Sequence, residues 1–266
     1  MVVTGDLVLN LRGMNINGYD CFVNTSNQAW KYGNTYYPFH SSTHGVTTPN
    51  PNFPVINEVA TDYTKVSPCC LKLSNWYEIY IYNNLVTNKY TTFTLYFWTK
   101  YSPFYSSNPT NSEWTHAGSV FIAYSNATIF GRGYKNSIGV KNASSNAQDF
   151  TWSKGNVNTW HNFAIVVSGN NKKIFYDGTK IVDYNTSFSD NISQLILNCF
   201  YETIWYDDIV LVGNQALWSS NFTPPSTYLI DDSQTIPVDK IKRRNIVHAN
   251  VDKKLIIPDD DTMKQY

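Results

Sequence analysis

The stretch WHNFAIVVSGNNKKIFYDGTKIVDY, residues 160–184, decides the fold of this chain. Every second residue from His161 to Val167 belongs to one face of an extended run, which is the side-chain period of a β-strand. The polar residues 168–171 follow directly and predict a turn.

A second run, residues 172–176, ends at the dipeptide Asp177-Gly178. Both residue types tolerate positive φ, and the pair is typical of a two-residue hairpin turn. Residues 180–184 then form a third run, which is expected to pair with the second. We therefore expect three short antiparallel strands joined by two tight turns, with His161 as a sheet residue and Asp177 as a turn former.

The same pattern of short strands and turns recurs along the chain. Low Glu content with many Tyr, Thr and Val residues favours strands over helices, and no convincing amphipathic helix is present. Residues 12–68 show little regular pattern. Strands are predicted over residues 6–11, 71–73, 77–82, 91–100, 119–124, 128–130, 138–141, 192–199 and 205–212. The fold class is therefore all-β, an antiparallel β-sandwich or jelly roll.

Bulk composition excludes several classes of protein. Hydrophobic residues make up 42% of the 266, enough for a sizeable core, and the formal net charge is +0. A nucleic-acid partner is not expected, because the body of the chain has no basic field. Neither an export signal nor a run of about 20 apolar residues is present, so we expect no leader and no membrane insertion. The four cysteines, Cys21, Cys69, Cys70 and Cys199, are predicted to be buried free thiols.

Two motifs carry a family resemblance. They are the hairpin pattern W-H-x-hydrophobic-A followed by YxDG, from Trp160, and the strand pattern DDI-x-L from Asp207. With DLVLNLRG, CLKLSNWYEIYI and FTLYFWTKY, they make most of residues 1–232 resemble the laminin-G-like branch of the concanavalin A-like jelly-roll superfamily. The resemblance implies two twisted antiparallel sheets. It also implies a recognition module (lectin, adhesion or virion attachment domain), although some relatives in the superfamily are glycoside hydrolases.

Composition changes after about residue 232. Residues 233–266 contain no Trp or Phe, seven Lys or Arg and five Asp, which predicts a C-terminal arm beside the jelly-roll domain of residues 1–232. Such a polar segment is either a solvated end or an arm that docks on another subunit or protein. We expect docking or oligomerisation, through the basic residues Lys240, Lys242, Arg243 and Arg244.

Catalytic patterns are missing from the sequence. Cleavage of a glycosidic bond needs two carboxyl groups across the scissile bond, and no Glu here has an acidic residue two or three positions away. Asp207 and Asp208 are adjacent on a strand, so their side chains are expected to point to opposite faces and to bond backbone or a turn hydroxyl. No GxSxG nucleophile elbow is present either. We expect a protein that is not an enzyme.

Aromatic residues in the loops are the candidate ligand-binding groups. Exposed Tyr and Trp rings stack on sugars, but the same residue types also cap sandwich ends or lie in protein interfaces, and that second role is the commoner one. The candidates are Tyr105, Trp114, Tyr134 and Trp152.

No cofactor is assigned. Calcium is conceivable because some laminin-G-like domains bind it through rim carboxylates, here Asp149, Asp183 and Asp190, but no continuous calcium loop is present.

Together these features predict a non-catalytic structural or attachment protein of a tailed bacteriophage, as a decoration, fibre or tail-associated protein. It would be made in the host cytoplasm and located on the virion. Its partners would be other virion proteins or copies of itself, together with a host-surface glycan. The alternatives are a glycoside hydrolase and a secreted bacterial lectin.

Overall fold

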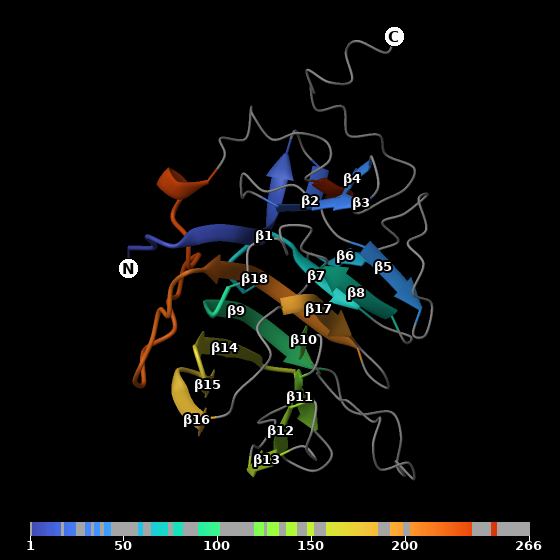
Figure 1. The fold of residues 1–266 in the computed structure, drawn as a ribbon. Helices are drawn as coiled ribbons and strands as arrows, with labels where there is room; N and C mark the ends of the chain where they lie inside the picture. Colours follow the sequence, from blue (N-terminus) through green and yellow to red (C-terminus); the bar gives the residue numbers. More distant parts are fainter. Residues whose placement is uncertain are drawn as a thin grey trace.

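The chain folds into two large antiparallel sheets and one small one (Figure 1). The structure is a computed structural model. It describes residues 2–16, 19–24, 30–32, 35–37, 40–43, 58–60, 65–73, 77–81, 90–101, 120–124, 127–132, 137–142, 148–151, 158–185, 192–198, 203–235 and 246–248. No helix in this part of the chain is long and apolar enough to cross a membrane.

The first sheet has ten strands. Its main path is β16 (Thr179–Asn185), β15 (Asn171–Tyr176), β14 (Trp160–Ser168), β9 (Thr92–Tyr101), β18 (Ile204–Gly213), β1 (Asp6–Ile16), β2 (Tyr19–Asn24) and β19 (Ile246–His248). Off this path, β7 (Cys70–Leu73) pairs with β18, and β6 (Glu58–Ala60) pairs with β7.

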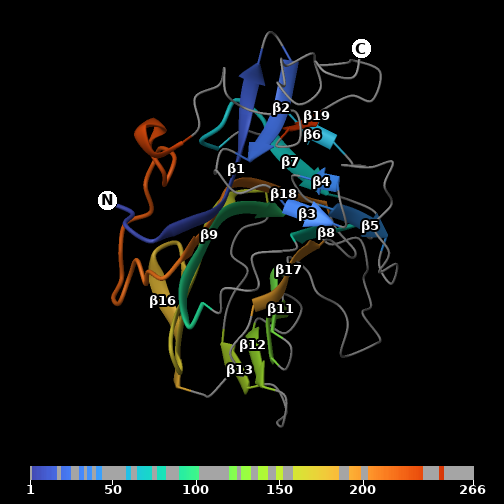
Figure 2. The ribbon, with the colours of Figure 1, turned by 45° about the horizontal axis from the view of Figure 1, so that its top comes forward.

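The second sheet has seven strands. Their order is β13 (Gln148–Thr151), β12 (Ser137–Asn142), β11 (Ala127–Arg132), β10 (Val120–Tyr124), β17 (Ile192–Asn198), β8 (Tyr77–Ile81) and β5 (His40–Thr43). A third sheet contains only β3 (Trp30–Tyr32) and β4 (Thr35–Tyr37). Every strand pair described is antiparallel, and the two large sheets form separate layers in Figure 2.

One face of the ten-stranded sheet is turned toward the seven-stranded sheet. Phe97 on β9 stacks on Phe163 on β14 with 5.4 Å between ring centroids. Farther along the same face, Tyr184 on β16 meets Phe150 on β13, a strand of the other sheet, at 5.4 Å. Aromatic contacts of this kind add to the burial of apolar area between packed sheets. The expected antiparallel β-sandwich is confirmed.

The opposite face of the ten-stranded sheet is covered by residues 214–235, which we call the strap. Leu229 and Ile230 of the strap are buried in one cluster with Tyr96, Val210 and other side chains of this face. The strap carries its own aromatic pair, Trp218 and Phe222, stacked at 3.9 Å, and Phe222 packs edge-on against Phe175 of β15.

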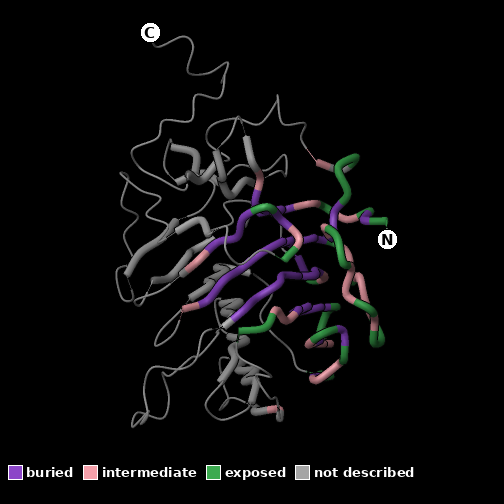
Figure 3. The backbone as a smooth tube through the Cα atoms, turned by 180° about the vertical axis from the view of Figure 1, so that it is seen from behind, coloured by how far each residue is buried: buried purple, intermediate pink, exposed green. Residues whose placement is uncertain are grey.

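The central strands β1, β9, β14 and β18 are therefore buried on both faces, and they form the buried band in Figure 3. This explains why β18 is buried along its whole length rather than at alternate residues.

The 160–184 hairpins have the predicted form. Asp177 and Gly178 have φ values of 48° and 75° and join β15 to β16, while Gly169, with φ 55°, lies in the turn between β14 and β15. Cys69 and Cys70 are buried free thiols as expected, and Cys21 and Cys199 have side chains outside the described set.

Residues 12–68 contain more strands than the sequence predicts. β1 continues to Ile16 and pairs with β2, and β3 to β6 also lie in this region. These strands were missed because most have three to six residues, too few for a period-2 pattern to stand out.

Among the described residues of the C-terminal arm, Ile246 to His248 pair with Val23 to Cys21 at the edge of the ten-stranded sheet. The boundary at residue 232 stays a prediction. Lys240, Lys242, Arg243 and Arg244 lie outside the described residues.

Substituting the turn glycines tests whether the strap is locked to the hairpin. A Cβ at Gly178 would lie 1.9 Å from the carbonyl oxygen of Phe222, whereas a Cβ at Gly169 meets nothing within 4 Å. Both glycines have positive φ, so alanine at either position costs about 1 kcal/mol of backbone strain. We expect Gly178→Ala to lower the free energy of unfolding by about 3 kcal/mol in total because overpacking is added to the strain.

Urea unfolding followed by tryptophan fluorescence measures both variants, with Gly169→Ala as the matched control. Equal losses in the two variants would contradict the contact between the strap and the hairpin.

Candidate functional site

A chain of polar groups crosses the end of the β14–β15 hairpin. Nε2 of His161 lies 2.9 Å from the Thr159 hydroxyl, and Nδ1 of His161 lies 2.7 Å from Oδ2 of Asp177. The other carboxylate oxygen of Asp177 accepts from the backbone N–H of Asn162 at 2.8 Å. The imidazole stacks on Tyr176 with 4.9 Å between ring centroids.

The order hydroxyl, imidazole, carboxylate is also that of an activated nucleophile. Here it follows from local hairpin geometry, because Phe163 is registered with Tyr176 and the residues flanking that pair therefore meet. Asp177 is held by its turn and by Asn162, so the chain fixes the hairpin end. His161 is a sheet residue and Asp177 a turn former, as the sequence predicts. The contact between His161 and Asp177 was not predicted, although the pairing of Phe163 with Tyr176 in the hairpin places these two residues next to each other.

A second polar cluster lies in the middle of β18. Asp207 is fully buried and its carboxylate accepts four hydrogen bonds. Three come from the segment before β7: the backbone N–H of Val66 at 2.9 Å, the backbone N–H of Ser67 at 3.0 Å, and the Ser67 hydroxyl. The fourth comes from the backbone N–H of Asp208 at 2.8 Å. Asp207 thus has the predicted role of bonding backbone and a turn hydroxyl.

Asp208 differs from the prediction. The register between β18 and β9 shifts between Asp207 and Val210, and Asp208 adopts φ 47°, the left-handed conformation of a β-bulge. Oδ2 of Asp208 accepts from the backbone N–H of Leu229 in the strap at 2.8 Å. Both carboxylates therefore bond segments that pack on the same face of the sheet. The expectation of opposite faces was wrong because it assumed a regular strand.

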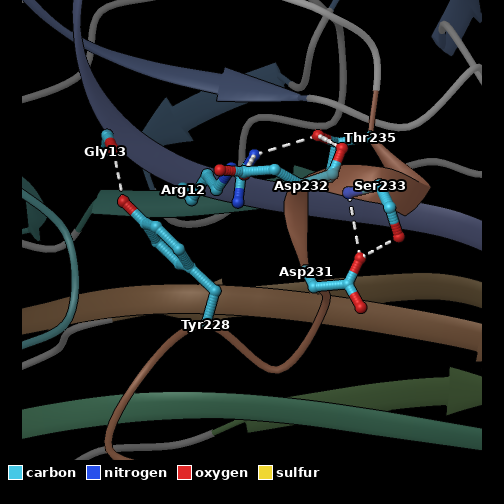
Figure 4. A network of polar contacts seen from close by, with 7 residues as sticks. All are labelled: Arg12, Gly13, Tyr228, Asp231, Asp232, Ser233 and Thr235. Carbon is cyan, nitrogen blue, oxygen red and sulfur yellow. Dashed lines mark hydrogen bonds and ion pairs between the residues drawn. The ribbon is translucent and has the colours of Figure 1, made fainter. Parts of the chain in front are cut away.

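Arg12 on β1 contacts the end of the strap (Figure 4). Its side chain is 3% exposed, and Nη2 donates to Oδ1 of Asp232 at 2.8 Å and to the Thr235 hydroxyl at 3.1 Å. The guanidinium lies 4.4 Å from the ring centroid of Tyr228, whose hydroxyl donates to the Gly13 carbonyl at 3.1 Å. β1 thereby holds the end of the strap with two of its groups: the Arg12 guanidinium, which binds Asp232, and the Gly13 carbonyl, which accepts from the Tyr228 hydroxyl.

Charge in this cluster is unbalanced. Leu11 is registered with Ile209, so Arg12 and Asp208 are the next residues on their strands and attract each other. Arg12 also pairs with the exposed Asp232, and Asp207 adds a second buried carboxyl. Burial, with a smaller repulsion from Asp207, raises the pKa of Asp208 to about 7 despite the Leu229 hydrogen bond and Arg12. Burial also raises the pKa of Asp207, against the hydrogen bonds from Ser67, Val66 and Asp208.

Neither carboxylate can act on a sugar in this arrangement. Glycoside hydrolysis needs two carboxyl groups that face the scissile bond with room for substrate between them. Asp207 and Asp208 are both fully buried and bond the chain's own backbone. Their chemistry is that of an internal anchor.

The sequence-predicted ligand residues cannot be placed. Tyr105, Trp114, Tyr134 and Trp152 lie outside the described residues, as does Asp190, and the side chain of Asp149 is also not described. Asp183 is bound to Lys180 and Asn171 within the hairpin, and these hydrogen bonds lower its pKa. Among the described residues no three His, Cys, Asp or Glu side chains form a metal cluster.

Comparison with solved structures identifies similar folds. The receptor binding domain of botulinum neurotoxin mosaic serotype C/D matches with a TM-score of 0.52 and 14% identity, over 82% of this chain and 49% of that chain. This chain therefore spans about half the length of that domain. Weaker matches are the carbohydrate binding module CBM66 from Bacillus subtilis and domain 4 of AbnA, a GH43 extracellular arabinanase from Geobacillus stearothermophilus, in complex with arabinotriose. The first has a TM-score of 0.37 and 14% identity over 51% of this chain and 82% of that chain. The second has a TM-score of 0.39 and 14% identity over 57% of this chain and 75% of that chain.

No family model and no curated protein sequence matches the chain. At 14% identity the toxin domain demonstrates a shared fold and nothing more. The chain has a β-sandwich fold that is similar to the fold of this toxin domain.

Removing the Asp207 carboxylate tests its role as an anchor. We expect Asp207→Ala to lower the free energy of unfolding by about 3 kcal/mol because several buried donors lose their acceptor. Asp207→Asn should lose less, since an amide oxygen still accepts from Val66 and Ser67. Thermal or urea unfolding at pH 8 checks this, with the exposed Asp183→Ala as control. Equal effects of the Asp207 and Asp183 substitutions would contradict the anchor role.

Proposed function

We propose that this chain is a non-catalytic recognition domain that binds glycans on a surface, and that it serves as an attachment or structural protein on the virion of a tailed bacteriophage. One observation carries the first part: a domain named for receptor binding shares the fold over 82% of this chain. The similarity extends to fold only, so the ligand class is our inference.

Local chemistry supports binding over catalysis. The buried carboxylates of β18 bond backbone amides and the strap, and Asp177 is bound by the hairpin. These acidic groups are used to hold the fold. A binding module needs only a rigid sandwich that presents loops, and the stacked rings Phe97 and Phe163 with the strap on the other face supply that rigidity.

Loop aromatics are the proposed contacts to the sugar. Tyr105, Trp114 and Trp152 lie between strands of the two large sheets in sequence, and Tyr134 lies between β11 and β12. Aromatic faces pack on the C–H surface of sugar rings, while Asn and Ser side chains in the same loops bond hydroxyls.

The virion role rests on the sequence. The basic cluster 240–244 and the acidic run 259–261 carry opposite charges, which suits them to join copies of the chain or to bind other virion proteins. A glycoside hydrolase or a secreted lectin would share the sandwich, and release of reducing sugar in the experiment below separates the hydrolase from the two binding roles.

A glycan array probed with the purified chain tests recognition. We expect binding to a defined group of glycans, and a loss of at least about tenfold in affinity for Trp114→Ala or Trp152→Ala, because each removes a stacking face. Trp218→Ala in the strap is the matched control and should leave binding unchanged. Absence of binding across host polysaccharides, or release of reducing sugar on incubation with them, would contradict a non-catalytic glycan-binding role.

Charge reversal tests the arm. The variant with Lys240, Lys242, Arg243 and Arg244 all changed to Glu should lose self-association while its circular dichroism and unfolding midpoint stay those of the parent. Analytical ultracentrifugation at low and high salt measures this, because contacts between opposite charges weaken with ionic strength. Assembly that persists in the variant would contradict docking through the arm and leave the glycan proposal untouched.

A further inference from the structure

The strap is attached to the sheet in two chemically different halves. Residues 214–222 are held by neutral acceptors: Oε1 of Gln215 accepts from the N–H groups of Thr4 and Gly5, at 2.8 Å each, and Oδ1 of Asn221 accepts from the N–H of Lys180 at 2.8 Å. The backbone N–H of Phe222 also donates to the Gly178 carbonyl at 2.9 Å. Among the described side-chain hydrogen bonds of this half, the ionisable partner is Asp6, which is exposed and accepts from Asn214.

The second half, residues 226–235, depends on charged groups. Its attachments include the hydrogen bonds from the Leu229 N–H to Asp208 and from the Tyr228 hydroxyl to Gly13, and those from Arg12 to Asp232 and Thr235. The Arg12 guanidinium also lies over the Tyr228 ring. Asp208 and Arg12 are buried, at 0% and 3% exposed, and each joins a strand of the sheet to the strap. We call Asp208 with Arg12 the latch.

Four described elements bring a titratable or charged group close enough to interact with Asp208. β18 contributes Asp207, β1 contributes Arg12, β9 contributes Tyr96, and the strap contributes Tyr228. Lys65 lies farther out, over the ring of Trp98. Burial, with the negative charge of Asp208 and Asp207 added, raises the pKa of Tyr96 above its ordinary range, and burial also raises that of Tyr228. Both tyrosines are neutral near pH 7, which leaves the carboxyls of Asp207 and Asp208, and Asp208 is the one that is bonded to the strap.

Asp208 has one carboxylate oxygen on Leu229, while the other has no hydrogen-bond partner among the described residues. An ionised carboxylate in this position is costly because it is buried beside Asp207 and shares its one cation with Asp232. A neutral carboxyl keeps the Leu229 bond and avoids that cost.

We propose that residues 226–235 are a pH-sensitive latch, closed over β1 and β18 when Asp208 is protonated and loosened when Asp208 ionises. This inference does not depend on the proposed function. Its consequence concerns the arm, since residues 226–235 lie on the only covalent path from β18 to β19 and the basic cluster.

The direction follows from the two states of the strap. When it is open, Asp208 meets water and returns toward the ordinary aspartate pKa of 3.8, whereas in the closed state its pKa is about 7. Below pH 4 both states hold the proton and closure is strongest. Between pH 4 and 7 the open state releases the proton first, so closure weakens by up to about tenfold per pH unit. Above pH 7 both states are ionised and closure is weakest.

Amide hydrogen exchange of the full chain at pH 5, 6, 7 and 8, corrected for the intrinsic rate, measures the latch directly. Protection of residues 226–235 should fall by up to about tenfold per unit from pH 5 to 7 and level off by pH 8. Protection of residues 214–222 and of β14 should stay constant. Constant protection of residues 226–235, or a parallel fall in β14 that reports global unfolding, would overturn the proposal.

Variants separate the charge from the contact. Asp208→Asn keeps an oxygen for the Leu229 N–H and cannot ionise, so its protection profile should be flat. Tyr228→Phe removes the bond to Gly13 and should lower protection by the same factor at every pH, which leaves the slope as in the parent. Asp183→Asn, at an exposed carboxylate of the hairpin, should change nothing. A parental slope in Asp208→Asn, or a lost slope in Tyr228→Phe, would overturn the assignment to Asp208.

Discussion

Burial of the ten-stranded sheet on both faces is the constraint on which the rest of the structure depends. One face is paired with the seven-stranded sheet, and the chain covers the other with its own strap. A segment without regular secondary structure cannot satisfy its backbone groups by itself, so the sheet must supply partners for them. Thr94 does so on β9, accepting from the Leu217 N–H and donating to the Gln215 carbonyl, at 3.0 Å each.

The same need explains why charged residues lie in the centre of the sheet. Asp207 fixes the segment before β7, and Asp208, turned by a bulge, fixes the strap. Each carboxylate accepts a hydrogen bond from a backbone N–H group that has no neighbouring strand to pair with. Burying a carboxylate for this purpose costs free energy. The adjacent pair thus holds two segments that are far apart in sequence. Acidic residues on a strand of such a sandwich therefore are not by themselves a sign of catalysis.

Sequence reasoning predicted the fold class and the hairpins well because their signals are local. The alternation over residues 160–167 indicates a strand, and the Asp177-Gly178 dipeptide indicates a tight turn. Both signals depend on residues that are close together in the sequence. It failed where a structure depends on distant partners. A bulge at Asp208 has no signature in the dipeptide Asp-Asp, and the need for it arises from Leu229, 21 residues away. Arg12 was assigned no role from the sequence because its partners, Tyr228 and Asp232, lie at the other end of the chain. The loop aromatics and the basic cluster of the arm remain predictions from sequence.

The central physical claim is that a buried, near-neutral Asp208 joins the strap to the sheet. Titration of the aspartate carboxyl carbons by ¹³C NMR, with Asp208→Asn to assign the signal, tests this claim most directly. The account predicts that the carboxyl signal assigned to Asp208 titrates with a midpoint near 7. A midpoint near the ordinary 3.8 would mean that the carboxylate is solvated, and would contradict the burial of Asp208 beneath a closed strap.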